Sequence, residues 1–508
     1  MNEARRKFLR TSVCGLTGAA MAASLDRFNL VNAMVQEQPA ADYKALVCIF
    51  LLGGSDCNNM VIPYDDYTNP TGGTTNGYDN VRTGSGLAVP KSALTNTKIT
   101  PSNTSGVSYA FHPNLSPEAN NALQLKGFMD VWNSGKLAVL CNVGSLVQPI
   151  TRAQYSAGTG RPYQLFSHSD QVNQQQSSIA NTTGQTGWAG RVADKTNGLN
   201  GSVALPMNIS LAGSSLFCTG INSRPLAISP APTTLANLLL LNWSGPSIAN
   251  PITNGSSFRT LLGFDQSSAL IKVASDTTSQ ALIADAALNQ PDPVLTATFP
   301  STSLGNQLKQ IAKLIKIKDA VGITMKRQIF FCSAGGYDTH TNETGSDPTN
   351  PGGGGAGSGS QGVLLSQLSQ AMRAFHDEMV AQGRSNDVTQ FTLSDFGRTL
   401  QPSGSGPATV GTDHAWGSHA FIMGGAVLGG AFYGSVRPDG SGLPYGYPVL
   451  QLAGPDDTSS NRGQWIPTTS IDQYGATLAN WYGLTTTDRA AVFPNLSRFA
   501  TPNLGFLG

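Results

Sequence analysis

Four strand-like stretches of the chain contain Val, Ile, Leu and Phe without a strict alternation of polar and apolar residues, at residues 45–52, 137–143, 328–333 and 389–393. This pattern is typical of parallel strands, because helices cover both faces of a parallel sheet and leave no polar side. Patterns of helical period separate the runs, at residues 117–134, 304–318, 363–381 and 471–482. The alternation of strand and helix predicts an α/β fold with a mainly parallel central sheet flanked by helices.

Three ranges interrupt this alternation. Residues 65–106 are crowded with Thr, Asn and Gly, and residues 347–362 contain a glycine-rich run. The second range follows an acid-and-histidine motif, so it is either a flap over a site or an unconstrained surface insertion. Residues 184–300 mix short apolar runs with turn residues, and we expect a cap or an insertion in the sheet there.

The composition gives no indication of nucleic acid or anionic lipid as a partner. Charged residues are 12% of the 508, and the formal net charge of +1 provides no field to attract nucleic acid or anionic lipid. Five of the six cysteines follow Cys14, and an odd number argues against a full disulfide framework. Beyond the N-terminal segment, no apolar stretch reaches the ~18 residues that a membrane span needs.

The N-terminus carries Arg5-Arg6 and Phe8-Leu9 ahead of a weakly apolar run at 11–23. It resembles a twin-arginine export signal. Small residues precede position 34, so we expect a signal peptide at 1–33, cleaved after Ala33, and a single α/β domain at 34–508. The resemblance implies the twin-arginine export machinery as a partner, a periplasmic or secreted location, and no stable membrane span once the signal is removed.

Acidic residues follow three of the apolar runs. Asp56 comes after 45–52, Asp338 and His340 after 328–333, and Asp395 after 389–393. The carboxyl ends of parallel strands meet at one edge of a sheet, so these side chains are expected to converge. Imidazole and carboxylate together suit a divalent cation, and the sequence therefore predicts a metal site at this edge.

Two further motifs add to this set. Asp413-His414 is followed five residues later by His419, which we interpret as a weaker ligand or a supporting residue, with Asp413 orienting His414. The segment Ser167-His168-Ser169-Asp170 opens a predicted helix at 170–178 and places a serine near a helix N-terminus. Ser167 is either a nucleophile or an ordinary helix cap, with His168 and Ser169 as alternatives for the same role.

In order, these motifs resemble the DUF1501 family, which is placed in the alkaline phosphatase and sulfatase superfamily. The resemblance rests on Gly-Gly-x-Asp at 53–56, Ser-His at 167–168, Gly-Gly-Tyr-Asp-Thr-His at 335–340, Asp-Phe-Gly-Arg-Thr at 395–399 and Asp-His at 413–414. It implies an alkaline phosphatase-like fold with one or two divalent metals (Zn, Mn, Mg or Ca) at the strand ends.

Transferred to this chain, the resemblance implies metal ligands at Asp56, Asp338, His340, Asp395 and His414. It places Ser167 at the position of the nucleophile. Arg398 is then either an anion clamp or the partner of a nearby carboxylate that fixes the loop. Two departures stand out. Phe396 occupies the place of a second-metal histidine, and Asp338-Thr339-His340 shortens the usual spacing.

Two hypotheses for function follow. The leading one is an exported metal-dependent hydrolase of phosphate or sulfate esters, in which the metal activates Ser167 or water. The alternative is a non-catalytic envelope or secreted binding protein that retains the fold, and Phe396 favours it. Asp170 belongs to the supporting residues in either case.

Overall fold

The computed structural model describes residues 40–71, 73–120, 126–238, 262–263, 267–345, 359–406 and 409–508. The expected signal peptide at 1–33 and most of the glycine-rich range at 347–362 lie outside these residues. None of the helices in the described part of the chain combines the length and hydropathy needed to span a bilayer.

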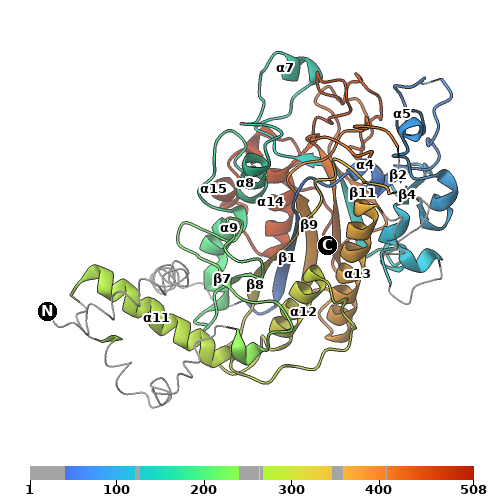
Figure 1. Ribbon diagram of the computed structural model, residues 1–508. Helices are drawn as coiled ribbons and strands as arrows, with labels where there is room; N and C mark the ends of the chain where they lie inside the picture. Colours follow the sequence, from blue (N-terminus) through green and yellow to red (C-terminus); the bar gives the residue numbers. More distant parts are fainter. Residues whose placement is uncertain are drawn as a thin grey trace.

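A nine-stranded, mostly parallel sheet forms the centre of the molecule (Figure 1). Its strands run in the order β11-β5-β10-β9-β1-β8-β6-β7, with β12 also paired to β5. Only β10 runs antiparallel to its neighbours among these strands. The strands are β1 (Lys44–Leu51), β5 (Leu137–Gly144), β6 (Asn208–Ser210), β7 (Leu226–Ala227), β8 (Arg327–Ala334), β9 (Val388–Ser394), β10 (Ser418–Gly424), β11 (Phe432–Tyr433) and β12 (Thr469–Ser470).

Both faces of this sheet are buried, which explains the lack of a strict alternation of polar and apolar residues. In β1, Val47 and Ile49 belong to one hydrophobic core, and Cys48 and Phe50 belong to another. The first core includes residues of α12 (Ser303–Lys316) and α13 (Ser360–Ala381), and the second includes residues of α9 (Trp188–Thr196) and α14 (Ile471–Tyr482). Successive side chains point to opposite faces, so β1 is apolar from Ala45 to Leu51 without alternation. The helices lie on either side of the sheet in Figure 1.

Shorter elements surround this layered body. Beside it lies a three-stranded antiparallel sheet of β2 (Val61–Pro63), β4 (Tyr109–Phe111) and β3 (Lys98–Ile99). The other α-helices are α4 (Cys57–Met60), α5 (Tyr78–Arg82), α6 (Met129–Asn133), α7 (Arg152–Ser156), α8 (His168–Ser177), α11 (Ala269–Leu288) and α15 (Arg489–Val492). The 3₁₀ turns are η1 (Thr83–Ser85), η2 (Lys91–Thr97), η3 (Pro113–Leu115), η4 (Pro117–Asn120), η5 (Asn197–Asn200), η6 (Leu235–Asn237) and η7 (Leu496–Arg498).

The predicted α/β class with a mainly parallel, helix-flanked sheet is confirmed. The four apolar runs form β1, β5, β8 and β9, and three of the four helical patterns form α12, α13 and α14. The fourth pattern, at 117–134, is wrong as one continuous helix. It contains η4 and α6, with residues 121–125 between them outside the description.

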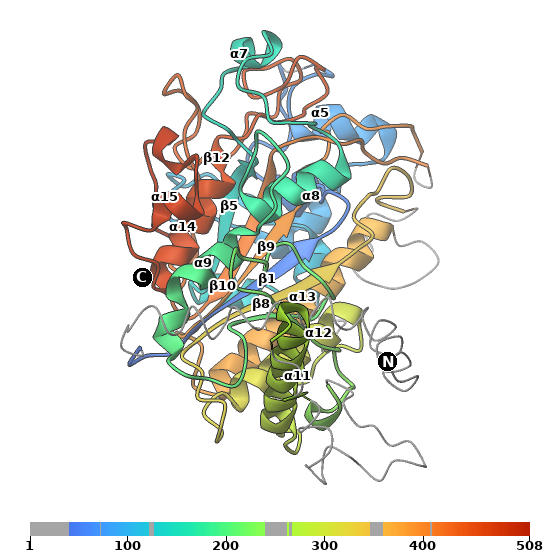
Figure 2. The same cartoon turned by 90° about the vertical axis from the view of Figure 1, so that its left-hand side faces the viewer.

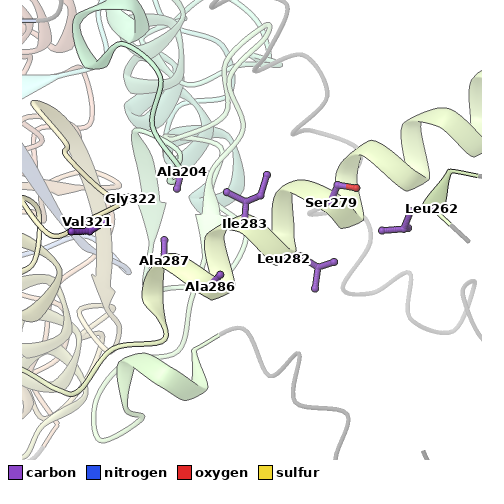
Figure 3. A pocket seen from close by; sticks show the side chains of 9 residues that line it. All are labelled: Ala204, Leu262, Ser279, Leu282, Ile283, Ala286, Ala287, Val321 and Gly322. Atoms are coloured by element: carbon purple, nitrogen blue, oxygen red, sulfur yellow. The ribbon is translucent and has the colours of Figure 1, made fainter. Parts of the chain in front are cut away.

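The range 184–300 contributes to two regions. It supplies α9 and the edge strands β6 and β7 of the main sheet. It also contains α11, which projects from the body (Figures 1 and 2). A cavity of about 510 Å³ lies against this helix, and Ala204, Ile283, Ala287 and Val321 are among its mainly apolar lining residues (Figure 3).

Candidate metal centre

Three neighbouring strands deliver three loops to one edge of the sheet. β1 pairs with β8 on one side and β9 on the other, all parallel, so their carboxyl ends lie together. The Gly53 amide donates to Asp395 Oδ1 at 3.2 Å, and the Tyr337 amide donates to the Leu52 carbonyl at 3.1 Å. A Cβ at Gly53 would lie 2.4 Å from the Asp338 amide nitrogen. These contacts hold the β1 and β8 loops against each other.

The side chains of His168, Asp338 and His414 meet at this edge. Each offers one ligand atom, and the three atoms lie within 4.8 Å of one another. His168 Nε2 is 3.1 Å from His414 Nε2, and the two nitrogens are 3.5 and 3.2 Å from the Asp338 carboxylate oxygens. The ligand set thus combines α8, the loop after β8, and the loop before β10.

His340 joins the same group. Its Nε2 lies 3.0 Å from His414 Nε2 and 3.0 Å from Asp338 Oδ1. Asp338 and His340 are 42% and 43% exposed, so the cluster is open to solvent on this side. A cation held there would be reachable by a substrate or by water.

The outer nitrogen of each imidazole is already engaged. His168 Nδ1 lies 2.8 Å from Asp395 Oδ2, His340 Nδ1 lies 3.2 Å from Asp413 Oδ1, and His414 Nδ1 lies 2.9 Å from the Phe166 carbonyl oxygen. Carbonyl and carboxylate oxygens only accept hydrogen bonds, so each Nδ1 carries the proton. In a neutral imidazole the Nε2 then has a bare lone pair.

Lone pairs facing one another at 3.0–3.1 Å repel unless a positive charge lies between them. One proton could bridge only one of these pairs. A tetrahedral cation about 2.0–2.1 Å from each nitrogen would separate neighbouring ligand atoms by about 3.3 Å, close to the distances found. Histidines that donate their other N–H to a carboxylate or carbonyl are the usual ligands of such ions. The donor set therefore fits a divalent metal.

The surroundings favour a neutral His414 and an ionised Asp338. Burial, and then the neighbouring charge of Arg398, lowers the pKa of His414 despite its bond to the Phe166 carbonyl. Partial burial raises the pKa of Asp338, but its hydrogen bond to Arg398 and the nearby positive charges outweigh this, and the net pKa is below the usual value.

Phe396 forms an apolar wall beside two of the imidazoles. Its ring centroid lies 4.8 Å from that of His168 and 4.7 Å from that of His414. The residue is fully buried, and a Cβ on Gly54 would lie 2.4 Å from its ring. The side chain that replaces an expected ligand histidine therefore packs against the ligand imidazoles.

Arg398 is a buried residue that holds the Asp338 side chain and the loop at Thr412 in place. It is fully buried, and its Nη1 donates to Asp338 Oδ1 at 2.7 Å and to the Gly53 carbonyl at 3.1 Å. Its Nε donates to Thr412 Oγ1 at 2.7 Å, and its Nη2 donates to the Thr412 carbonyl. This arrangement matches the alternative in which Arg398 pairs with a carboxylate and fixes the loop, rather than an anion clamp facing open space.

Asp56 lies in a different environment from the histidine cluster. Its side chain is fully buried and pairs with Arg82, whose Nη1 is 2.6 Å from Oδ2 and whose Nη2 is 3.0 Å from Oδ1. Oδ1 also accepts from the Asn58 backbone and side-chain amides. The structure therefore places this expected ligand in a buried ion pair at the start of α4.

Asp395 and Asp413 contact the outer nitrogens of two candidate ligands, His168 and His340. Asp395 accepts from His168 and from the Gly53 amide. Burial raises its pKa above the usual value, although its bond to His168 acts in the opposite direction. Asp413 contacts His340, whereas the sequence suggested His414, and it also accepts from Ser403 Oγ and Arg462 Nη1. Both carboxylates orient imidazoles.

Ser167 and Asp170 form a pair next to the cluster. Ser167 occupies the N-cap position of α8 but makes no side-chain cap bond. Its hydroxyl donates to Asp170 Oδ2 at 2.6 Å and also lies 3.2 Å from Ser169 Oγ.

His419 does not contact the cluster formed by His168, His340 and His414 in the hydrogen bonds and ring contacts of the described residues. It lies on β10, is almost fully buried, and accepts from the Asn142 amide through Nδ1 at 3.1 Å. Burial lowers its pKa to about 3.

The structure gives His168 a larger role than the sequence did. The motif Ser167-His168-Ser169-Asp170 drew attention to its serine, and the signal that pointed to the histidine was only its place at the start of a helix. The Phe166 carbonyl and the buried residue Arg82 had no recognisable sequence signal. Backbone acceptors and long-range buried pairs leave no local pattern.

Comparison with known proteins gives limited matches. Residues 323–443 match the family described as "Protein of unknown function (DUF1501)", in agreement with the resemblance seen in the motifs. This range contains Asp338, His340 and His414 but not His168. No curated protein matches the chain.

Two solved structures show weak similarity in fold. One is Ps i-CgsB in complex with k-i-k-neocarrahexaose, at 7% identity, with a TM-score of 0.30 over 91% of this chain and 77% of that chain. The other is the PsFucS1 sulfatase from Pseudoalteromonas sp., at 10% identity, with a TM-score of 0.23 over 80% of this chain and 67% of that chain.

Proposed function

We propose that this chain is a metal-dependent hydrolase of phosphate or sulfate esters, with a divalent cation held by His168, Asp338, His340 and His414. The observation that supports the metal is the convergence of three Nε2 atoms on one carboxylate, with every Nδ1 engaged by an oxygen acceptor. The exposed side of the cluster supports access of a substrate.

When bound, such a cation supplies Lewis acidity toward an ester oxygen and toward water. The residues of the protein orient the ligands and the candidate nucleophile. Asp395, Asp413 and the Phe166 carbonyl keep the three Nε2 lone pairs directed inward, and Arg398 holds the Asp338 carboxylate. Asp170 Oδ2 accepts the Ser167 hydroxyl proton, an arrangement that suits a serine nucleophile activated by a carboxylate.

Metal analysis of the purified protein tests the first part. We expect stoichiometric Zn, Mn or another divalent ion in the wild type, and its loss in His168→Ala and in His414→Ala. His376→Gln, on α13 and outside the cluster, is the control and should retain the metal. A wild-type protein that takes up no divalent ion when incubated with Zn²⁺ or Mn²⁺ would refute the proposal.

Turnover of aryl phosphate and aryl sulfate by the metal-loaded protein tests the second part. We expect hydrolysis of at least one ester, and turnover slower by about 100-fold or more in Ser167→Ala with the metal retained. Full activity in Ser167→Ala would instead point to direct attack by water, which excludes Ser167 as nucleophile.

A second candidate is a non-catalytic envelope or secreted binding protein that retains the fold. The engaged state of Arg398 favours it, since Nε, Nη1 and Nη2 of this guanidinium all donate to groups of the protein rather than to an open anion site. Metal bound in stoichiometric amount, a higher melting temperature with metal, and no turnover of either ester would support this candidate.

Export through the twin-arginine machinery is part of the same proposal. Arg5-Arg6, Phe8-Leu9 and the weakly apolar run after them support it, with a periplasmic or secreted location as the consequence. The intact mass of the exported chain checks cleavage after Ala33.

A further inference from the structure

A buried group of charged residues lies beneath the candidate metal centre. Asp56, Arg82 and Glu343 are each fully or almost fully buried, and they come from the start of α4, from α5 and from the loop after β8. The group holds two carboxyls and one guanidinium. If both carboxyls were ionised, one negative charge would be buried without a partner, which is costly.

Hydrogen bonds connect Glu343 to the metal-binding carboxylate in three steps. The Thr412 hydroxyl donates to Glu343 Oε2 at 2.6 Å, and the same hydroxyl oxygen accepts from Arg398 Nε at 2.7 Å. Arg398 Nη1 then donates to Asp338 Oδ1 at 2.7 Å. The single proton of a threonine hydroxyl fixes the direction of this chain, because it is given to Glu343 and leaves a lone pair for Arg398.

The second carboxyl oxygen of Glu343, Oε1, indicates that this side chain carries a proton. Oε1 is buried and has no hydrogen-bond donor among the described residues. The neighbouring carboxyl is that of Asp56, whose Oδ2 accepts only from Arg82 Nη1 among the described residues. A carboxylic acid at Glu343 could donate its proton to Asp56. An ionised Glu343 would leave Oε1 without a partner.

We propose that Glu343 is a neutral, protonated positioning residue that donates its proton to Asp56 and, through Thr412 and Arg398, holds Asp338 in place for the metal. This inference rests on the proposed metal site and adds a residue to it. Glu343 itself does not touch the metal or the substrate.

The charges around Glu343 act in the same direction. Burial first, and then the negative charge of Asp56, raise the pKa of Glu343 to about 8, although Arg82 and the Thr412 hydroxyl oppose this. The charged and titratable groups that act on it are Asp56 and Arg82, with Tyr78 beside Arg82 and Arg398 beyond Thr412. Arg82 remains a cation, because the carboxylate of Asp56 more than offsets the effect of its burial.

Metal affinity in matched variants tests the positioning role. Glu343→Gln keeps a neutral side chain with a donor and an acceptor, so we expect an affinity for Zn²⁺ within about twofold of the wild type. Glu343→Ala should lower the affinity about 10–100-fold, the range seen for residues that orient ligands. Glu378→Gln, a buried carboxyl on α13 that accepts from Thr296 and Ala297, is the control and should bind Zn²⁺ normally.

Thr412 provides a second pair of variants if Glu343→Ala fails to fold. Thr412→Ser keeps the hydroxyl and should retain the affinity for Zn²⁺, whereas Thr412→Val removes both hydrogen bonds and should lower it about 10–100-fold. Equal affinities in Thr412→Val, Thr412→Ser and the wild type would overturn the proposed connection.

The pH dependence of unfolding tests the proton. Between about pH 5 and 8 the unfolded chain has ionised Glu343 and the folded chain has not, so the unfolded state binds one proton fewer. The unfolding constant of the metal-free wild type should therefore rise by an extra factor of about ten per pH unit relative to Glu343→Gln, and the extra slope should end near pH 8. Parallel profiles would show that Glu343 is already ionised and would refute the proposal.

The two proposals fail in different ways. If the wild type binds no divalent ion, the proposed function is wrong, while the pH profile still decides where the Glu343 proton lies. If the wild type binds Zn²⁺ and the affinities of Glu343→Ala and Thr412→Val are unchanged, only the positioning role of Glu343 is wrong.

Discussion

Each imidazole in the cluster is oriented by an oxygen atom that contacts its Nδ1 and does not belong to the candidate metal ligands. Two of these oxygens belong to Asp395 and Asp413, and the third is the Phe166 carbonyl. Phe166 adopts φ of +70°, a left-handed conformation that is rare for a bulky residue. Strained backbone of this kind persists where the surrounding structure requires it, and here it presents a carbonyl to His414.

Removal of the orienting carboxylates should weaken the metal site without removing a ligand. We expect Asp395→Ala to lower Zn²⁺ affinity about 10–100-fold, because His168 loses the acceptor that fixes its Nδ1 proton. Asp413→Ala should have a smaller effect, since its contact with His340 is longer and more exposed. Competition with a chromophoric chelator measures both.

Asp377→Ala is the control for these variants, because Asp377 pairs with Arg373 on α13 away from the site. Equal affinities in Asp395→Ala and the wild type would mean that the ring of His168 is held by packing against Phe396 alone.

The sequence pointed to three of the four side chains that lie together at this edge, and one failure is instructive. Asp338 and His340 stood out because they follow an apolar strand, and His414 stood out because it belongs to an Asp-His motif. Asp56 follows β1 with the same Gly-Gly-x-Asp signal. Its partner Arg82 lies in the range 65–106, which looked like an irregular loop, and pairing across 26 residues leaves no local pattern.

At the level of elements, the strands with two buried faces were predictable and β10 was not. β1 and most of β5 and β8 are apolar because cores lie on both faces, whereas β9 also carries the buried polar residues Thr389, Gln390 and Thr392. β10 begins with Ser418 and His419, directly after a motif that carries chemistry, so its polar start hid a strand. Its antiparallel direction depends on how distant segments pair, and a single-sequence pattern does not contain that information.

A glycine at the end of β1 sets the distance between two of the site's loops. Gly53 has φ of +118°, and a Cβ there would lie 2.4 Å from the Asp338 amide nitrogen. We expect Gly53→Ala to lower the free energy of unfolding by roughly 2 kcal/mol or more, because strain and overlap add. It should also reduce metal affinity, since the overlap pushes Asp338 away. Denaturant titration and metal competition measure the two effects.

Gly335 is a matched control at the end of β8. It has no heavy atom within 4 Å of the position of an added Cβ and no positive φ. Gly335→Ala should leave both the stability and the metal affinity close to those of the wild type. Similar behaviour of the two variants would show that the β1 and β8 loops adjust to each other freely.

Across the whole molecule, the candidate metal joins segments that are far apart in sequence. His168 lies on α8, Asp338 and His340 follow β8, and His414 precedes β10. A match that covers only residues 323–443 therefore includes part of the ligand set, and the rest depends on the complete fold. The described cysteines provide no alternative link, because Cys48, Cys57, Cys141, Cys218 and Cys332 are all buried free thiols.

Hydrogen exchange can show this connection directly. A ligand at about 100 times its Kd adds about 2.7 kcal/mol to states in which its site is formed, so local opening of the joined loops should become about 100-fold rarer. We expect slower exchange with Zn²⁺ at the Thr412 amide, which donates to the Thr339 carbonyl at 3.1 Å, and at amides near the start of α8. Amides of β1, buried in the centre of the sheet, exchange when the whole fold opens, and because this also destroys the site they should slow by a similar factor. Amides of α11, which projects from the body (Figure 1), can open while the site stays formed and should exchange at the same rate with and without metal. If protection rises in neither the loops nor β1, His168, Asp338 and His414 do not share an ion.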